Sequence, residues 1–194
     1  MRTCAIPVYG CAQGCFYSGM TDTYTDLAPN GRVHRRVYTD PDVFAAEMER
    51  IFRRAWVYIA HESQLTEPGD FVTAHIGDRP VIVSRHSDGE IYAFANRCTH
   101  RGMKVCAARQ GSKKRFICPY HGWAFATDGT LIGIPHGKGY NGKIDPKDPD
   151  LALARVARVE SYRGFVFASD TSDGPTLTEY LGPMTRAIDN TVDR

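Results

Sequence analysis

The stretch ANRCTHRGMKVC at residues 95–106 and the stretch CPYHGW at residues 118–123 each place one cysteine close to one histidine. One residue separates the pair in the first stretch, and two residues separate the pair in the second. The four side chains are Cys98, His100, Cys118 and His121. Thiolate and imidazole ligands suit zinc, iron and copper, so this pattern predicts a metal site.

The division of the ligands between the two loops narrows the kind of metal site. A structural zinc finger usually takes two cysteines from one short loop and two histidines from another. Here each loop supplies one of each, which suits two metal atoms, one bound by both cysteines and the other by both histidines. A [2Fe–2S] cluster of the Rieske type has this ligand set. We therefore expect Cys98 and Cys118 on one iron and His100 and His121 on the other.

The residues around the two loops agree with such a site. Seventeen residues separate the pairs, which is enough for a strand, a turn (Gly111-Ser112 with Lys113 and Lys114) and a returning strand, so that two loop tips could face each other. Gly102 and Gly122 directly follow the loops, where a missing side chain lets the backbone approach the cluster. Pro119 stiffens the second tip.

Downstream of Trp56 the chain shows short β-rich runs separated by turn signals. The runs are WVYIA (56–60), FVTAHI (71–76), PVIVSR (80–85), EIYAFAN (90–96), FICPY (116–120), WAFAT (123–127), TLIGI (130–134), ARVARVES (154–161) and GFVFAS (164–169). Turn signals lie at 87–89 and 128–129, whereas residues 135–150 are loop-like in composition. Regular short strands favour a compact antiparallel domain, so we predict a mainly β fold.

Helical patterns flank the strands on both sides. A residue at 39–40 can cap a helix that has Pro41 in its first turn and five apolar side chains on one face. These side chains are Val43, Phe44, Met48, Ile51 and Phe52. Near the other end, Thr176 and Glu179 form a capping box for a short helix, and Pro183 should end that helix or start another.

These patterns predict four parts of the chain. They are a loosely ordered arm at 1–38, a helix at 39–56, a β domain with the metal site at 57–170, and a helical segment at 171–194.

Composition excludes several classes of function. A net charge of +2 is too small to indicate a nucleic acid or membrane partner, and no apolar run approaches the roughly 18 residues of a membrane-spanning helix. Six cysteines in 194 residues are too dilute for a secreted disulfide scaffold, and the N-terminal sequence is a poor secretion signal. We therefore expect a cytoplasmic protein with reduced thiols.

The sequence also resembles a known family over about residues 32–194. IFRRAWVYIAHESQLTEPGDF (51–71), FANRCTHRGMKV (94–105), FICPYHGWAFATDGTLIGIP (116–135) and ESYRGFVFAS (160–169) resemble the N-terminal half of the α subunit of aromatic-ring-hydroxylating dioxygenases. The metal motif is the most specific part of this resemblance. The resemblance implies a Rieske-type antiparallel β domain, made of small sheets with two cluster-binding hairpin loops. The segment WVYIAHESQ (56–64) is similar to the sequence of family members that act on benzoate-like acids.

The resemblance implies a path for electrons and a set of partners. In this family an NADH-dependent reductase or a ferredoxin supplies electrons to the cluster. From there they reach a mononuclear Fe(II), held by two histidines and a carboxylate in a second domain. An oxygenase β subunit and other α subunits are further implied partners. The resemblance also implies that His121 connects through a carboxylate to the iron site of a neighbouring subunit.

The chain departs from the family in lacking the second site. After His121 the only histidine is His136, and no acidic residue with two closely spaced histidines follows. Four further histidines show no paired spacing, and we interpret them as surface or packing residues. They are His34, His61, His75 and His86. We therefore expect this chain to carry electrons, to contain no catalytic residue of its own and to lack the domain for the mononuclear iron.

Weaker features are open to two interpretations. Six basic residues and no acidic one lie at 101–115. They are either a rim that steers an acidic redox partner or the exposed side chains of a solvated hairpin. The six residues are Arg101, Lys104, Arg109, Lys113, Lys114 and Arg115. Tyr120 and Trp123 are expected to shield the cluster. Cys4, Cys11 and Cys15 match no ligand spacing.

Three alternatives remain on the sequence alone. A stand-alone Rieske ferredoxin would be an electron carrier rather than part of an enzyme, although the helices at both ends exceed what such a carrier needs. A zinc-bound structural module would use the same four ligands on one metal ion. A defective gene fragment would have the motifs without a partner.

Overall fold

The computed structural model describes residues 24–28, 31–140, 144–145 and 147–193, and its chain divides into two units, Met1–Val43 and Phe44–Arg194. In the described part of the first unit, the regular secondary structure is helical. The helical segments are η1 (Tyr24–Leu27), α1 (Arg36–Thr39) and the start of α2 (Pro41–Glu47). The four-part division of the chain stays a prediction, and most of its N-terminal arm lies outside the described residues.

The second unit begins in the helix that the sequence predicted, but that helix changes type. From α2 the chain continues as a π-helical turn, η3 (Met48–Phe52). A Cβ on Gly77 would lie 2.9 Å from the Met48 sulfur and 3.0 Å from the Phe52 Cβ, so these two side chains pack on the turn between two strands. The prediction that five apolar residues share a face was wrong, because Phe44 and Ile51 are exposed. A π turn spaces its residues differently from an α-helix, which rotates Ile51 away from the packed side.

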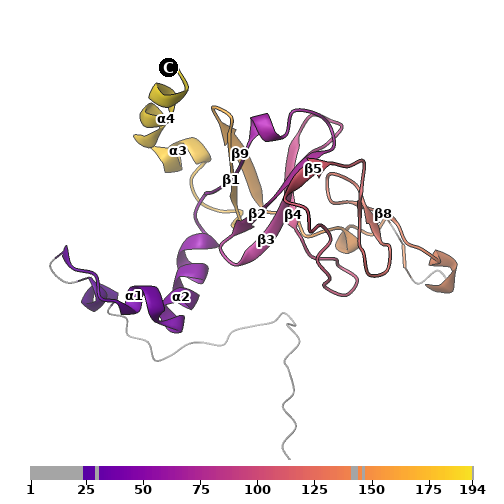
Figure 1. Ribbon diagram of the computed structural model, residues 1–194, viewed down its shortest axis with the longest axis horizontal. Helices are drawn as coiled ribbons and strands as arrows, with labels where there is room; N and C mark the ends of the chain where they lie inside the picture. Colours follow the sequence, from indigo (N-terminus) through magenta and orange to yellow (C-terminus); the bar gives the residue numbers. More distant parts are fainter. Residues whose placement is uncertain (1–23, 29–30, 141–143, 146, 194) are drawn as a thin grey trace, which may run out of the picture. The chain divides into compact units, whose positions relative to one another are not determined.

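Ten antiparallel strands form three small sheets in the described part of the second unit, which confirms the predicted mainly β, Rieske-type fold (Figure 1). The first sheet has the order β1-β10-β9, the second β4-β3-β2-β5 and the third β6-β7-β8. Their bounds are β1 (Val57–His61), β2 (Asp70–Ile76), β3 (Arg79–Arg85), β4 (Ile91–Ala95), β5 (Gln110–Ser112), β6 (Phe116–Ile117), β7 (Ala124–Phe125), β8 (Leu131–Gly133), β9 (Arg158–Tyr162) and β10 (Phe165–Ser169). The hairpin predicted at 87–89 joins β3 to β4, and the one at 128–129 joins β7 to β8.

Strands β2, β3 and β4 of the second sheet contribute to two different cores, one on each face of the sheet. On β3, Ile82 belongs to the core beneath the two Cys–His loops, whereas Val81 and Val83 belong to the core shared with the first sheet. Neighbouring strands repeat this alternation, since Phe94 on β4 pairs with Ile82 and faces the same core. Strands buried on both faces carry near-continuous apolar runs, which explains the sequence VIV at 81–83.

The third sheet carries the second Cys–His loop and is fixed to the second sheet by aromatic packing. β6 and β7 pair as a hairpin, with Phe116 opposite Phe125, and both rings are buried. The Phe116 ring meets the rings of Phe71 and Phe94 edge to face, with centroids 5.4 and 5.8 Å away. The position of the second loop therefore follows from one buried phenylalanine in the middle of the core.

The turn predicted at Gly111-Ser112 with Lys113 and Lys114 was wrong for its first two residues. Gly111 and Ser112 belong to β5, which pairs with β2 rather than with β6, whereas Lys113 and Lys114 lie between β5 and β6. The two Cys–His loops are consequently not connected by one hairpin between them: the first follows β4, and the second lies between β6 and β7. Gly111 fits the strand because a Cβ there would lie 3.2 Å from the ring of Phe71, so the missing side chain makes room for the core.

Two further helices follow the last strand, as the sequence predicted. Thr176 and Glu179 form the expected capping box at the start of α3 (Leu177–Leu181), and α4 (Met184–Val192) begins after Pro183. The Trp56 indole donates to the carbonyl of Pro175 at 3.1 Å, which holds the approach to α3 against the first sheet. Short 3-10 segments in the described part of this unit are η4 (Glu62–Gln64), η5 (Gly137–Tyr140) and η6 (Pro149–Leu151). In the described ranges, no helix has both the length and the apolar character needed to cross a bilayer.

Candidate metal centre

The two Cys–His loops have the same backbone frame despite their different Cys–His spacing. The N–H of Cys98 donates to the carbonyl of Met103 at 2.8 Å, and the N–H of Gly102 donates to the carbonyl of Cys98 at 2.8 Å. The second loop has the same two bonds, which again join residues five and four positions apart in the sequence. Cys118 donates to Trp123 at 2.8 Å, and Gly122 donates to Cys118 at 3.0 Å.

The glycine of each loop has a left-handed conformation, which the frame requires. Gly102 has φ of +74° and Gly122 has φ of +72°. Such values cost little for glycine and are unfavourable for residues with a Cβ. A glycine four residues after the cysteine is therefore part of the fold of each loop, as the sequence suggested.

The two cysteine thiols lie beside each other in the protein interior. Cys98 is 3% exposed and Cys118 is 2% exposed, and their side chains are within hydrogen-bond distance. Burial raises the pKa of the Cys98 thiol, and the neighbouring Cys118 raises it further. The backbone N–H groups of His100 and Arg101 donate to the Cys98 sulfur and oppose this rise. Amide donors directed at a sulfur are the surroundings that a bound thiolate needs.

The two imidazoles lie together on the outer side of the thiols. The ring centroids of His100 and His121 are 4.7 Å apart, and both residues are partly exposed. Burial lowers the pKa of His100, and the neighbouring His121 and Arg101 lower it further. The neutral imidazole is the form that binds metals, so this shift favours ligation.

Aromatic rings fix the orientation of both imidazoles. Trp123, which is 2% exposed, stacks on His100 from the other loop with centroids 4.8 Å apart and planes 7° apart. Tyr120 stacks on His121 at 3.7 Å, with the guanidinium of Arg101 5.7 Å from the tyrosine ring. Trp123 is placed to shield the site, as expected, whereas Tyr120 remains exposed. The cross-loop stacking was not foreseen, because no local pattern in the sequence shows it.

The chemistry of the donor set fits a two-iron cluster. A Rieske-type cluster asks for two protein ligands on each iron, and its sulfides supply the rest. Two adjacent buried thiols and two adjacent imidazoles match that requirement.

Comparison with protein families agrees with this geometry. Residues 55–160 match the family model described as Rieske [2Fe-2S] domain. The chain belongs to the Rieske [2Fe-2S] domain family. Members of this family bind a [2Fe–2S] cluster, and this is the cofactor of the Rieske domain in this chain.

Known relatives of this Rieske domain are subunits of larger oxygenases. The chain is 42% identical over 164 residues to the chlorobenzene dioxygenase subunit alpha of Cupriavidus sp. (strain PS12), covering 84% of this chain and 36% of that protein. It is also 42% identical to the toluate 1,2-dioxygenase subunit alpha of Pseudomonas putida, over 84% of this chain and 36% of the relative. The naphthalene 1,2-dioxygenase of Rhodococcus sp. has a similar structure, with a TM-score of 0.79, 39% identity, and coverage of 88% of this chain and 38% of that one. The chain thus spans little more than a third of the length of these relatives.

The remaining residues singled out in the sequence lie elsewhere. His61 and His86 take part in packing and hydrogen bonding, His61 against the ring of Phe165 and His86 with the hydroxyl of Thr127 at 2.6 Å. His34 and His75 are exposed. The three cysteines of the N-terminal arm lie outside the described residues.

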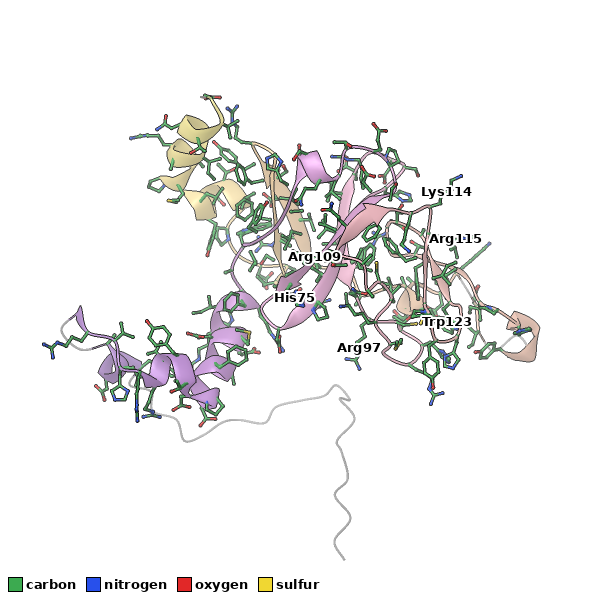
Figure 2. The ribbon with its side chains drawn as sticks, viewed as in Figure 1. His75, Arg97, Arg109, Lys114, Arg115 and Trp123 are labelled. Carbon is green, nitrogen blue, oxygen red and sulfur yellow. The ribbon has the colours of Figure 1, made fainter. Side chains whose placement is uncertain are left out.

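The six basic residues do not form a single rim. Arg101 stays beside the site, over Tyr120. Lys113 instead donates its backbone N–H to the carbonyl of Gly69, and Figure 2 shows Lys114 and Arg115 projecting away from Trp123. Arg101 therefore lies at the loops, whereas Lys114 and Arg115 point elsewhere.

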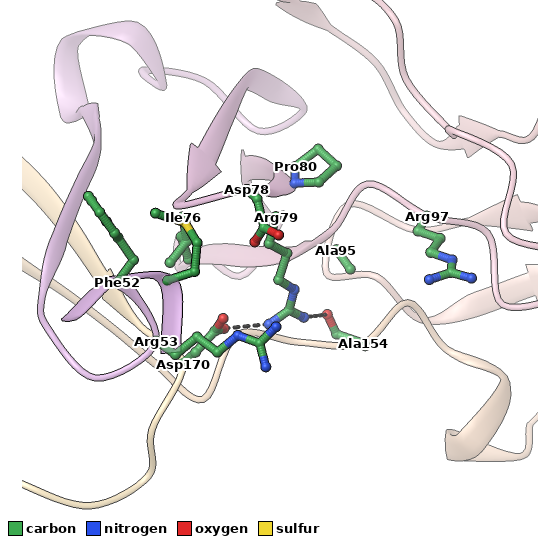
Figure 3. A pocket seen from close by; sticks show the side chains of 11 residues that line it. Phe52, Arg53, Ile76, Asp78, Arg79, Pro80, Ala95, Arg97, Ala154 and Asp170 are labelled. Carbon is green, nitrogen blue, oxygen red and sulfur yellow. Dashed lines mark hydrogen bonds and ion pairs between the residues drawn. The ribbon is translucent and has the colours of Figure 1, made fainter. Parts of the chain in front are cut away.

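A cavity of about 680 Å³ adjoins the first loop (Figure 3). Arg79 crosses it, forming an ion pair with Asp170 and donating to the carbonyl of Ala154 at 3.4 Å. Arg97 lines its far side and packs beneath Gly102, where a Cβ would lie 3.1 Å from the arginine Nε. The cavity wall is thus continuous with the stem of the first loop.

Proposed function

We propose that Cys98 and Cys118 bind one iron of a [2Fe–2S] cluster and that His100 and His121 bind the other. This assignment rests on one observation, which is that the two thiols are buried whereas the two imidazoles are partly exposed. The thiols are buried side by side, and the imidazoles lie 4.7 Å apart on the outer side of the same two loops.

When bound, a cluster with two imidazole ligands takes up and releases one electron at a higher potential than an all-cysteine cluster. The protein's own part is to hold two unlike ligand pairs at fixed positions and to keep water from the sulfur side. The imidazole side stays near the surface, where an electron can enter and leave. The chain is therefore an electron relay and contains no residue that makes or breaks substrate bonds.

We further propose that this relay serves an aromatic-ring-hydroxylating dioxygenase α subunit. Its relatives include the α subunits of chlorobenzene and toluate dioxygenases. Electrons would come from an NADH-dependent reductase or a ferredoxin and pass to a mononuclear iron site outside this chain, with an oxygenase β subunit and other α subunits as partners. A cytoplasmic location fits this role and the dilute cysteines. The benzoate-like substrate stays a prediction, because relatives of similar identity are named for benzene, biphenyl and a phenylurea as well.

Metal analysis of three proteins tests the ligand assignment. The purified chain should contain about two irons and two acid-labile sulfides, with visible absorption and an electron paramagnetic resonance signal after dithionite reduction. Cys118→Ser should remove both. Cys106→Ser is the matched control, because Cys106 is a third buried thiol of the same core and has no assigned role.

Retention of the cluster in Cys118→Ser, or its loss in Cys106→Ser alone, would contradict the assignment. A colourless protein with one zinc per chain would instead establish the structural zinc module. To test the oxygenase role, the adjoining coding sequence can be read for an acidic residue and two closely spaced histidines, whose absence would favour the stand-alone carrier.

A further inference from the structure

Asn96 is a buried polar residue directly before the first Cys–His loop, and its side chain is fully engaged. It is 2% exposed and follows the last residue of β4. Its Oδ1 accepts from the N–H groups of Val105 and Cys106 at 3.0 and 2.9 Å, and its Nδ2 donates to the carbonyl of Cys106 at 2.7 Å. The backbone N–H of Asn96 donates to the carbonyl of Pro80 at 2.9 Å, which ties the residue to β3.

These contacts join the two ends of the first loop. The loop leaves the sheet at Asn96 and returns at Val105 and Cys106, where the chain enters the core again. The second loop needs no such bridge, because β6 and β7 pair on either side of it. The stems of the first loop are not paired strands, since β4 ends at Ala95 and β5 begins at Gln110.

We propose that Asn96 is the positioning residue of the first ligand loop, replacing a strand ladder with one side-chain carboxamide. A carboxamide carries the same donor and acceptor groups as a peptide unit, so it can pair with a returning backbone as a neighbouring strand would. Two bonds to successive N–H groups and one to a carbonyl fix both the distance and the direction of the returning segment. Cys98 and His100 lie inside the closed loop and therefore take their positions from this pairing.

This inference rests on the proposed function, because positioning has a meaning only if the loop holds a cluster. Loss of the carboxamide leaves two N–H groups and one carbonyl buried without a partner. The first loop can then move relative to the second. Two of the four ligands of a cluster between the loops, Cys98 and His100, would no longer be held in position. The effect should therefore appear in cluster retention more strongly than in the stability of the fold.

The rate of iron release to a chelator, measured on the 194-residue chain well below its melting temperature, tests the proposal. Asn96→Ala should release iron roughly 10- to 100-fold faster than the parent, the range typical for losing a residue that supports metal ligands. Asn96→Asp keeps both acceptor bonds but sets an oxygen against the Cys106 carbonyl in place of the donor, so its rate should also exceed that of the parent. Val166→Ala is the matched control, because Val166 is fully buried in the other core, away from the loops.

The outcomes separate the two proposals. Asn96→Ala releasing iron no faster than Val166→Ala at an equal loss of melting temperature would overturn the positioning role and leave the ligand assignment intact. A parent chain that binds no cluster would overturn the proposed function before any variant is made. If Asn96→Ala does not accumulate as folded protein, Asn96→Asp decides alone, since it must exceed both the parent and Val166→Ala.

Discussion

Gly122→Ala should destabilise the protein more than Gly102→Ala, although the two glycines hold the same place in their loops. Their φ angles of +72° and +74° differ by only a little. Forcing an alanine into the left-handed region costs about 1–2 kcal/mol at either position. Backbone strain alone therefore predicts two equal effects.

The surroundings of the two glycines make the difference. A Cβ at Gly122 would lie 2.8 Å from the Cγ of Pro135, and a Cβ at Gly102 would lie 3.1 Å from the Nε of Arg97. The proline ring is rigid and fixed to its backbone, whereas the exposed arginine side chain can move aside. Overpacking against a group that cannot yield adds about 1–3 kcal/mol. For a chain of this size, about 2 kcal/mol corresponds to an additional fall in melting temperature of roughly 4–8 °C.

Thermal unfolding followed by circular dichroism, on variants with equal cluster content, measures this difference. Pro135→Ala removes the Cγ, so Gly122→Ala combined with Pro135→Ala should lose less stability than the sum of the two single changes. Pro135→Ala combined with Gly102→Ala should instead be additive. Equal melting temperatures for the two glycine variants, or additivity with Pro135→Ala in both, would refute the steric argument.

Three other changes give shorter tests. His121→Cys should lower the reduction potential by on the order of 100 mV, because a thiolate adds negative charge to its iron, and a redox titration that shows no shift would contradict the ligand assignment. Burial opposes ionisation of Asp128, yet the Thr130 hydrogen bonds and the Arg155 guanidinium hold its pKa below the ordinary value. The stability that its ionised form supplies is thus complete above about pH 4 and is lost as the pH falls through the lowered folded-state pKa. Asp128→Asn should reduce the loss of stability at acidic pH by about 1 kcal/mol, measured from melting curves at a series of pH values. An unchanged loss of stability would show that Asp128 does not contribute to it. Thr176→Ala should cost about 1 kcal/mol through loss of the α3 cap, and helix-resolved hydrogen exchange should localise the loss to α3 and α4.

The sequence predicted those parts of the structure that depend on neighbours along the chain. Runs of β-branched and aromatic residues located the strands, and turn residues located the hairpin at 87–89. Thr176 and Glu179 predicted the start of α3, since both bonds of a capping box lie within four residues. The four candidate ligands were proposed in the same way, from two short Cys–His spacings, and their assignment stays a prediction.

The features that the sequence did not predict depend on residues far apart or on competition between partners. Gly111 looked like a turn residue, but pairing with β2 offered its backbone a strand ladder and its missing side chain made room for Phe71. The five-residue apolar face failed at Phe44 and Ile51, and at Ile51 the π turn changes the angular spacing that the prediction assumed. Asn96 gave no signal, since its three bonds reach Val105 and Cys106, and their place is known only once the loop has folded back.

The unlike spacing of the two Cys–His pairs also has an explanation that only the structure supplies. Both loops close with the same two hydrogen bonds, so they have the same turn conformation. In each loop the glycine lies four residues after the cysteine. The histidines occupy different positions on that turn, two residues after Cys98 and three after Cys118. His100 can thereby stack on Trp123 of the other loop while His121 stacks on its own neighbour, Tyr120. The two imidazoles thus stack on different aromatic partners, one across the site and one within its own loop. The difference in spacing accompanies this difference in ring packing, whereas the loop frame itself is the same.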